Sequence, residues 1–232
     1  MYTHIPVLLE ETISGLNIKE DGIYLDLTLG RAGHSSEILK RISKGLLIGV
    51  DQDDEALTNS KKRLENIATN FKLFKSNFVN FPYILEKEGI DKVDGILMDL
   101  GVSSPQFDDP NRGFSYRNDS PLDMRMDQNN PLTAAKIVNT YSLEELTRVF
   151  REYGDEKFAY QIAKNIIKTR EKNPIETTNQ LVEIIKASKP MKVLAKQGHP
   201  AKQAFQALRI EVNDEINVLK ETLKKATSYL KS

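Results

Sequence analysis

The chain has 232 residues, with 33 basic and 33 acidic side chains, three histidines, no cysteine and a formal net charge of zero. A content of 39% hydrophobic and 28% charged residues is typical of a folded globular protein, and the lack of cysteine excludes disulfides, thiolate metal sites and a cysteine nucleophile. Because the sequence has neither an apolar run near the ~18 residues of a membrane helix nor a signal-peptide pattern, we expect a soluble, cytoplasmic protein without membrane contact.

The first half of the chain alternates short apolar runs with amphipathic stretches. The apolar runs predict strands at 23–29, 46–50, 71–74 and 93–100. Between them, the spacing of apolar residues predicts helices at 35–42, 55–67 and 82–88. Strands that alternate with helices pair in parallel, so we predict an α/β fold with a doubly wound sheet.

The pattern changes after Leu100. Residues 101–131 are rich in Gly, Pro, Asn, Asp and Ser without a period, which is typical of a long functional loop. From Pro131, which suits a first helical position, to about Lys189 the sequence predicts only helices. A last long helix at 200–230 could return to the sheet. We therefore predict a sheet domain at 1–115 and 205–232 and an all-helical insertion at 116–204.

Polar residues predict where the helices of the insertion begin. The segments Ser142–Glu145 and Thr177–Gln180 have the spacing of capping boxes, in which each side chain satisfies the other residue's free backbone N–H. Asp155 is placed to cap a helix that runs to about Lys172.

A glycine turn, Gly30-Arg-Ala-Gly33, follows the first strand and opens a helix. Glycine lets the backbone approach a ligand, and the helix start presents free N–H groups. The spacing matches neither the dinucleotide fingerprint nor the phosphate loop, which disfavours a pyrophosphate ligand. The alternative is a tight turn whose glycines serve packing only.

Two carboxylates follow strands of the predicted sheet. Asp51 comes directly after the second strand, where nucleoside-binding α/β folds hold ribose hydroxyls; the alternative is a surface acid in an acidic turn. Asp99 ends the fourth strand, where it could lie near both cofactor and substrate, unless it only caps the next turn. A ribose carboxylate beside a turn without diphosphate spacing suggests a nucleoside lacking phosphates, such as S-adenosylmethionine.

A segment without acidic residues runs from Lys186 to Arg209. Its cations are Lys186, Lys189, Lys192, Lys196, Lys202 and Arg209, and His199 could add a further charge. Such a segment either contacts phosphate or forms a solvated surface.

At these residues the sequence resembles the bacterial small-subunit ribosomal RNA methyltransferases that modify the exocyclic N4 of a decoding-region cytosine. The matching blocks follow the family's order over nearly the whole chain, at 4–12, 26–35, 49–53, 76–78, 94–106, 112–116, 122–127 and 198–210. The blocks Gly101–Gln106 and Leu122–Asp127 are highly specific.

The resemblance implies a Rossmann-like S-adenosylmethionine methyltransferase domain with a helical RNA-recognition insertion. It implies small-subunit (16S) ribosomal RNA, or the assembling small subunit, as the partner. Phe78 would pack on the adenine, Asp51 would bind the ribose, and residues 32–34 would line the methionine part. The implied cofactor-binding residues are Ala32, Gly33, His34, Asp51, Phe78, Asp99 and Gln106.

Two features depart from the family's pattern. The turn has fewer glycines than in many members, but Arg31 and Ala32 should fit because the family's contact there is largely through the backbone. The family also continues beyond residue 232 with a glycine turn and further strands. We therefore expect a sheet without its C-terminal strands and an open edge next to Asp99; that edge and the insertion would allow a homodimer.

The expected reaction is methyl transfer to a cytosine N4 whose lone pair is delocalised into the ring. An acceptor that hydrogen-bonds the amino group would localise the lone pair and help remove a proton, and no metal is needed. Asp99, or a backbone carbonyl in Gly101–Pro105, is placed to be this acceptor, and the candidate catalytic residues are Asp99, Ser103 and Ser104. The two serines occupy the stretch that corresponds to the Asp/Asn/Ser-Pro-Pro-aromatic block of DNA amino methyltransferases, here without the aromatic residue.

The target base must leave its stack to reach the methyl donor. Phe114 and Tyr116 are candidates to stack on it, or else pack within the loop. The candidates for RNA phosphate are Arg112, Arg125, His199, Lys202 and Arg209. Arg125 lies between two acids and could instead be a paired, structural arginine.

Two other functions remain open on the sequence alone. A nicotinamide-dependent oxidoreductase shares the fold outline, but the turn lacks the third glycine of its fingerprint. A non-catalytic RNA-binding or ribosome-assembly factor would fit a sheet without its last strands.

Overall fold

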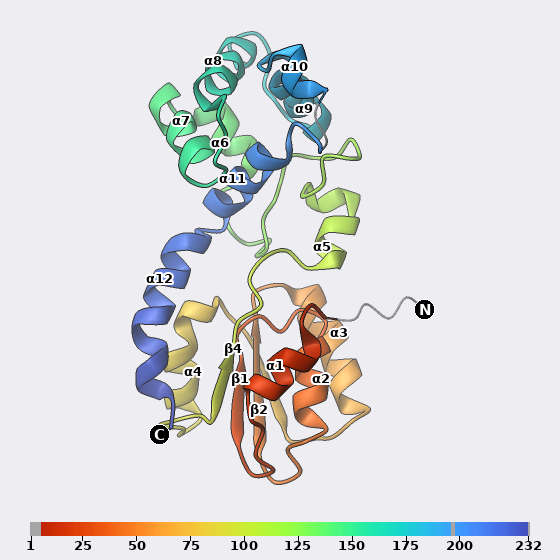
Figure 1. Cartoon of the computed structure of the whole chain (residues 1–232), viewed down its shortest axis with the longest axis vertical. Helices are drawn as coiled ribbons and strands as arrows, with labels where there is room; N and C mark the ends of the chain where they lie inside the picture. The colour runs from red at the N-terminus through yellow and green to blue at the C-terminus, as the bar shows by residue number, and fades with distance from the viewer. Residues whose placement is uncertain (1–5, 196–197, 232) are drawn as a thin grey trace. The chain divides into compact units, whose positions relative to one another are not determined.

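The computed structural model describes residues 6–195 and 198–231, so His4, Ile5 and Lys196 of the sequence motifs lie outside the described residues. The chain divides into two compact units (Figure 1). The first comprises Met1–Gly101 and Ile216–Ser232, and the second comprises Val102–Glu215.

The unit boundaries differ from the ones expected at 115/116 and 204/205. Phe114, Phe205 and Leu208, which the sequence assigned to the sheet domain, pack in the core of the helical unit. The insertion therefore begins earlier and ends later than its helical periodicity suggests.

The first unit is built on a parallel sheet with the strand order β3-β2-β1-β4. Its strands are β1 (Ile23–Asp26), β2 (Leu46–Asp51), β3 (Phe71–Lys75) and β4 (Gly95–Leu97). The four predicted strands are confirmed, although β1 and β4 are shorter than the apolar runs. Beyond β1, Leu27 N–H still donates to Leu97 O at 3.0 Å, and Leu29 N–H donates to Val50 O at 3.1 Å.

Helices cover both faces of this sheet, as a doubly wound fold requires (Figure 1). Neighbouring strand residues point to opposite faces, so Tyr24 packs in one core cluster with α2 and α3, and Leu25 packs in another with α4. The helices of this unit are α1 (Leu9–Gly15), α2 (Gly33–Leu39), α3 (Asp54–Glu65), η1 (Phe78–Asn80), α4 (Phe81–Lys87), α12 (Glu215–Ala226) and η3 (Thr227–Tyr229).

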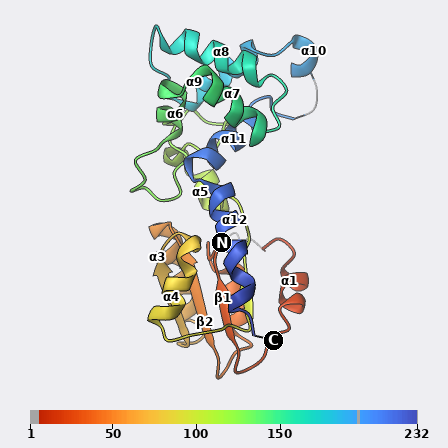
Figure 2. The same ribbon diagram turned by 90° about the vertical axis from the view of Figure 1, so that its left-hand side faces the viewer.

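The residues after α12 return to the sheet beside β4. Leu230 forms a parallel bridge with Val93, and Val93 N–H donates to Tyr229 O at 2.8 Å. The Tyr229 ring meets Phe81 of α4 edge-on at 5.2 Å, and Figure 2 shows α12 beside α4. Among the described residues β4 is the outermost strand on this side of the sheet.

The second unit is helical and has one core cluster of its own. Its helices are α5 (Ser104–Asp108), η2 (Pro110–Arg112), α6 (Ala134–Thr140), α7 (Leu143–Glu152), α8 (Ala159–Arg170), α9 (Thr178–Ala187), α10 (Met191–Leu194) and α11 (Lys202–Val212). No helix within residues 6–195 and 198–231 is long and apolar enough to cross a membrane.

Both predicted capping boxes are confirmed, at the starts of α7 and α9. Two other predicted helix starts are wrong. Pro131 precedes α6, which begins at Ala134 and is capped by Thr133. Asp155 has a left-handed backbone with φ of 49° and does not cap α8; the Glu156 carboxylate accepts from Phe158 N–H at 3.0 Å instead.

The single helix predicted at 200–230 is also wrong. The segment forms α11 and α12, which are separated at Asp214, where φ is 50°. A residue in the left-handed region cannot continue a right-handed helix, so the helix is interrupted here. The helical spacing of apolar residues continues across Asp214 and therefore gives no sign of this interruption.

Candidate active site

The glycine turn between β1 and α2 is fixed by hydrogen bonds to two other elements. Gly30 and Ala32 have positive φ values of 53° and 54°, a region that is unfavourable for an L-residue such as alanine. Gly30 N–H donates to Asp51 Oδ2 at 2.8 Å, and Gly30 O accepts from Ser60 Oγ of α3 at 2.7 Å. The backbone of the turn is therefore held in place at the carboxyl end of the sheet.

Asp51 is the last residue of β2 and meets the turn through its carboxylate. Its Oδ2 accepts from Gly30 N–H, and its Oδ1 accepts from Asp53 N–H at 3.0 Å. Burial raises the pKa of Asp51 to about 6, although both hydrogen bonds act in the opposite direction. Each oxygen keeps a further lone pair, so this carboxylate has the capacity to accept the two hydroxyls of a sugar diol.

A chain of hydrogen bonds links the end of β1 to Asp99, just after β4. Asp26 is 2% exposed and accepts from Ser35 Oγ at 2.6 Å and from Thr28 N–H at 3.1 Å. Thr28 Oγ1 in turn accepts from Asp99 N–H at 2.6 Å. Burial raises the pKa of Asp26, and the nearby charge of Asp99 adds to this rise. Asp99 is exposed, so its carboxylate is open to solvent next to a buried acid.

The other expected cofactor residues of the first unit offer backbone more than side chain. Ala32 is fully buried, and His34 is 7% exposed with its Nε2 3.2 Å from Val7 O. A Cβ on Gly33 would lie 2.3 Å from Pro6 Cγ, so this position has no room for a side chain. Phe78 begins η1 and packs, half-buried, against the core beneath α4.

In the second unit, Ser103 and Gln106 form a capping box at the start of α5. Gln106 N–H donates to Ser103 Oγ at 3.4 Å, and Ser103 N–H donates to Gln106 Oε1 at 3.1 Å. Ser104 is the first residue of the helix. These contacts shape the chain after Gly101; the catalytic roles of Ser103 and Ser104 and the cofactor role of Gln106 stay predictions.

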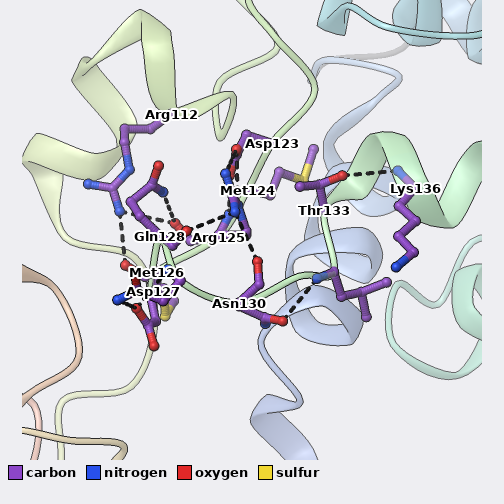
Figure 3. A network of polar contacts seen from close by, with 12 residues as sticks. Arg112, Asp123, Met124, Arg125, Met126, Asp127, Gln128, Asn130, Thr133 and Lys136 are labelled. Atoms are coloured by element: carbon purple, nitrogen blue, oxygen red, sulfur yellow. Dashed lines mark hydrogen bonds and ion pairs between the residues drawn. The ribbon is translucent and has the colours of Figure 1, made fainter.

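Figure 3 shows that Arg125 is held by the residues around it. Its guanidinium forms an ion pair with Asp123, with Nη2 2.7 Å from Oδ2. Its Nη1 donates to the carbonyl oxygens of Gln128 and Asn130 at 2.8 and 2.9 Å. This geometry matches the alternative of a paired, structural arginine rather than an RNA contact.

Arg112 and Arg209 are engaged in a similar way. Arg112 is 7% exposed, and its Nη2 donates to the carbonyl oxygens of Arg125 and Met126 at 3.0 and 3.1 Å. Arg209 forms two hydrogen bonds with the Glu215 carboxylate, at 2.7 and 2.9 Å. A phosphate would have to compete with these partners, so the structure gives no support to the phosphate contacts expected of Arg112 and Arg209.

The remaining RNA candidates lie close together. The Tyr116 ring stacks on His199 with centroids 4.1 Å apart and planes 8° from parallel. Lys202 is exposed at the start of α11, and its N–H donates to His199 O at 3.1 Å. Phe114, by contrast, is 5% exposed and packs in the core, which matches the alternative of loop packing.

The basic segment is not uniformly free to bind phosphate. Lys186 forms an ion pair with Glu183 at 2.8 Å. Lys189 is buried, pairs with Glu156 at 2.6 Å and donates to Pro200 O at 2.7 Å. Among the cations of this segment that the structure describes, Lys192 and Lys202 are exposed and form no ion pair.

The sequence of the whole chain decides the family to which this site belongs. A model of the MraW methylase family matches residues 1–232. The chain belongs to the MraW methylase family. It is 58% identical over 232 residues to a Mesoplasma florum protein and 54% identical over 232 residues to one from Halothermothrix orenii, both named Ribosomal RNA small subunit methyltransferase H. Each match covers 100% of this chain and 74% of the relative.

A solved structure from Clostridium thermocellum, provisionally described as an rRNA methylase, is similar to this chain with a TM-score of 0.37 and 22% identity. The match covers 43% of this chain and 54% of that one.

In this MraW-family methylase, the fold brings the glycine turn, Asp51 and Asp99 to one end of the sheet. Thr28, which joins Asp99 to the turn, was not among the residues predicted from the sequence. It lies two residues after Asp26 at the end of β1, a spacing that favours a hydrogen bond from the Thr28 N–H to the Asp26 carboxylate and could have indicated its role. Among the described residues, no group of three or more His, Asp or Glu side chains is placed to hold a metal ion.

Proposed function

We propose that this methylase transfers the methyl group of S-adenosylmethionine to the exocyclic N4 of a cytosine in the decoding region of small-subunit (16S) ribosomal RNA. The observation that carries the proposal is the glycine turn fastened to Asp51, with the exposed Asp99 at the end of a nearby strand. The names of the relatives from Mesoplasma florum and Halothermothrix orenii support the choice of RNA.

The residues at the turn fit a nucleoside cofactor without phosphates. Asp51 would bind the ribose hydroxyls, and the backbone of Ala32 and Gly33 would line the methionine part. Phe78 would pack on the adenine. The family's methylase activity implies S-adenosylmethionine, which supplies an electrophilic methyl group when bound. The backbone that the turn presents is already fixed by Asp51 and Ser60, so little ordering is left to occur on binding.

Asp99 would act on the target amine. Its carboxylate is exposed, while its backbone N–H is held by Thr28 Oγ1 at 2.6 Å. A carboxylate that accepts a hydrogen bond from the cytosine amino group localises the lone pair on N4 and takes the proton that N4 loses after methylation. The rest of the rate enhancement would come from the alignment of the two reactants.

The substrate would be small-subunit ribosomal RNA or the assembling small subunit, which places the enzyme in the cytoplasm. For RNA contacts we retain Tyr116, His199 and Lys202, because Arg112, Arg125 and Arg209 are engaged within the protein. The homodimer that the sequence would allow stays a prediction.

An Asp99→Ala variant tests the proposal. We expect methyl incorporation from labelled S-adenosylmethionine into small-subunit RNA to fall by about 100-fold or more, the usual size of a general-base effect, while cofactor affinity is kept. Asp91→Ala, which removes an exposed acid near the start of β4, is the matched control and should leave activity unchanged.

Methylation near the wild-type rate in Asp99→Ala would show that Asp99 is not the essential acceptor. A wild-type chain that binds RNA but transfers no methyl group would instead favour the non-catalytic alternative.

A further inference from the structure

An aromatic stack in the second unit has a structure suited to a nucleobase. Tyr116 contacts Phe107 and Phe205, whose ring planes lie at 84° and 87° to its own. His199 covers one face of Tyr116 in parallel, with ring centroids 4.1 Å apart. The Tyr116 ring therefore supports the His199 ring from one side, and His199 itself remains partly exposed.

The hydrogen bonding of His199 defines what the ring offers to a ligand. Ala201 N–H donates to His199 Nδ1 at 3.2 Å, which assigns the proton of the neutral ring to Nε2. Burial lowers the pKa of His199, and the charges of Lys186 and Arg117 lower it further. At neutral pH the ring is thus an uncharged aromatic surface with one N–H donor.

Two cations lie beside this stack. Arg117 follows Tyr116 directly in the sequence, and the backbone N–H of Lys202 donates to His199 O at 3.1 Å. Arg117 and Lys202 are exposed.

Stacked aromatic rings flanked by cations are how proteins hold unpaired nucleotides, since every base has a face for stacking and every linkage a negative charge. We infer that His199, stacked on Tyr116, is a platform for one unpaired RNA base, and that Arg117 and Lys202 contact the flanking phosphates. The inference rests on the proposed function for its choice of RNA as the ligand.

The test is fluorescence anisotropy with a short, unstructured, labelled RNA oligonucleotide and the full chain. His199→Ala should weaken binding about tenfold, the size of one base–aromatic stack, whereas His199→Phe keeps a ring and should stay within about threefold of wild type. Lys202→Ala should reduce the slope of log affinity against log salt by about 0.7, as expected for one lost phosphate contact. Lys136→Ala, on α6, is the matched surface control and should change neither quantity.

The platform is refuted if wild type does not bind the oligonucleotide, if His199→Ala binds as wild type does, or if Lys136→Ala loses as much affinity. Equal losses in His199→Ala and His199→Phe would also overturn it, because the ring would then not be the contact. A wild-type chain that methylates RNA while His199→Ala binds normally refutes the platform alone; a chain that binds through His199 but never methylates refutes the proposed function alone.

Discussion

At the scale of single residues, the most informative group is Asp51, because its buried environment disfavours the ionised form of its carboxyl group. Burial raises its pKa to about 6 from an ordinary value of 3.8. The folded protein therefore holds this proton more tightly than the unfolded chain does, so ionisation of Asp51 lowers the free energy of unfolding as pH rises through this range. A carboxylate kept charged at such a cost is typical of a binding site.

This shift predicts a pH dependence for the cofactor. Protonated Asp51 cannot accept both ribose hydroxyls, so the affinity for S-adenosylhomocysteine should fall as the pH is lowered through about 6. Asp51→Asn should bind at least about tenfold more weakly, because its amide nitrogen cannot accept a hydrogen bond, and should lose the pH dependence. Calorimetry at several pH values measures both effects. An unchanged pH profile in Asp51→Asn would assign the titration to another group.

Thr28 is predicted to position Asp99. Thr28→Val keeps the shape of the side chain but removes the oxygen that accepts from Asp99 N–H. Losing one such bond should lower the turnover of methyl transfer by about tenfold and leave cofactor affinity unchanged, and Thr28→Ser should restore most of the rate. Steady-state kinetics with both variants separates these effects. Equal activity of the valine and serine variants would remove Thr28 from this role.

The residues of the candidate site were predictable where the chemistry is local to a strand end. Gly30, Asp51 and Asp99 stand directly after apolar runs, and parallel pairing brings such positions together. The partner of Asp99 was not predictable, because the contact with Thr28 depends on the register between β1 and β4. The burial of Arg112 could not be foreseen either, since an arginine in a polar loop has no periodic pattern.

At the scale of elements, the buried ion pair between Lys189 and Glu156 joins three segments of the helical unit. Lys189 follows α9, Glu156 precedes α8, and Lys189 Nζ also donates to Pro200 O ahead of α11. The side chains are 4% and 1% exposed, so each charge depends on the other for compensation. Lys189 therefore connects Glu156 with Pro200, the residue that directly follows His199.

Breaking this pair should be costly. Lys189→Met leaves the Glu156 carboxylate buried without its cation, which should lower the free energy of unfolding by about 3–5 kcal/mol. The double variant Lys189→Met/Glu156→Leu should recover most of this loss, because neither charge then remains. Urea denaturation of both variants measures the difference. A single variant within about 1 kcal/mol of wild type would show that water or another group compensates the carboxylate.

Elements with a strong period were predicted well, and their ends were not. The β2 strand and the capping boxes of α7 and α9 match their predictions. An apolar run and a capping box each depend only on residues that are close together in the sequence. The break at Asp214 left no trace in the apolar period of 200–230. Asn213 beside it donates to Met124 O at 2.8 Å, a contact between residues far apart in sequence that only the folded unit reveals.

At the scale of the whole molecule, the chain is two units of different construction. The helical unit is one continuous segment, 102–215, with a core cluster that lies entirely within it. The sheet unit is made of two segments, and the second supplies α12 and the residues that pair with Val93. The sequence predicted an insertion of this kind from its run of helices without strands. The bounds of the insertion depend on tertiary packing, because Phe114 and Phe205 belong to the core of the helical unit.

The helical unit should therefore fold by itself. A fragment of residues 102–215 should show helical circular dichroism and one cooperative thermal transition, because its buried residues need no partner outside the segment. The matched control is the segment 1–101 without α12, which should unfold less cooperatively because the core around Phe81 then lacks Ala226 and Tyr229. A fragment 102–215 without a cooperative transition would contradict this prediction.

The split construction of the sheet unit also sets an order of events during translation. Residues 102–215 emerge from the ribosome before α12 does, so the inserted unit can close its core first. The sheet receives the cover of α12 only when Ala226 and Tyr229 emerge and pack beside Phe81. A nascent chain that stalls between the two segments would carry a finished insertion on a sheet whose face beside Phe81 is only partly covered, and that intermediate is the one a chaperone would have to protect.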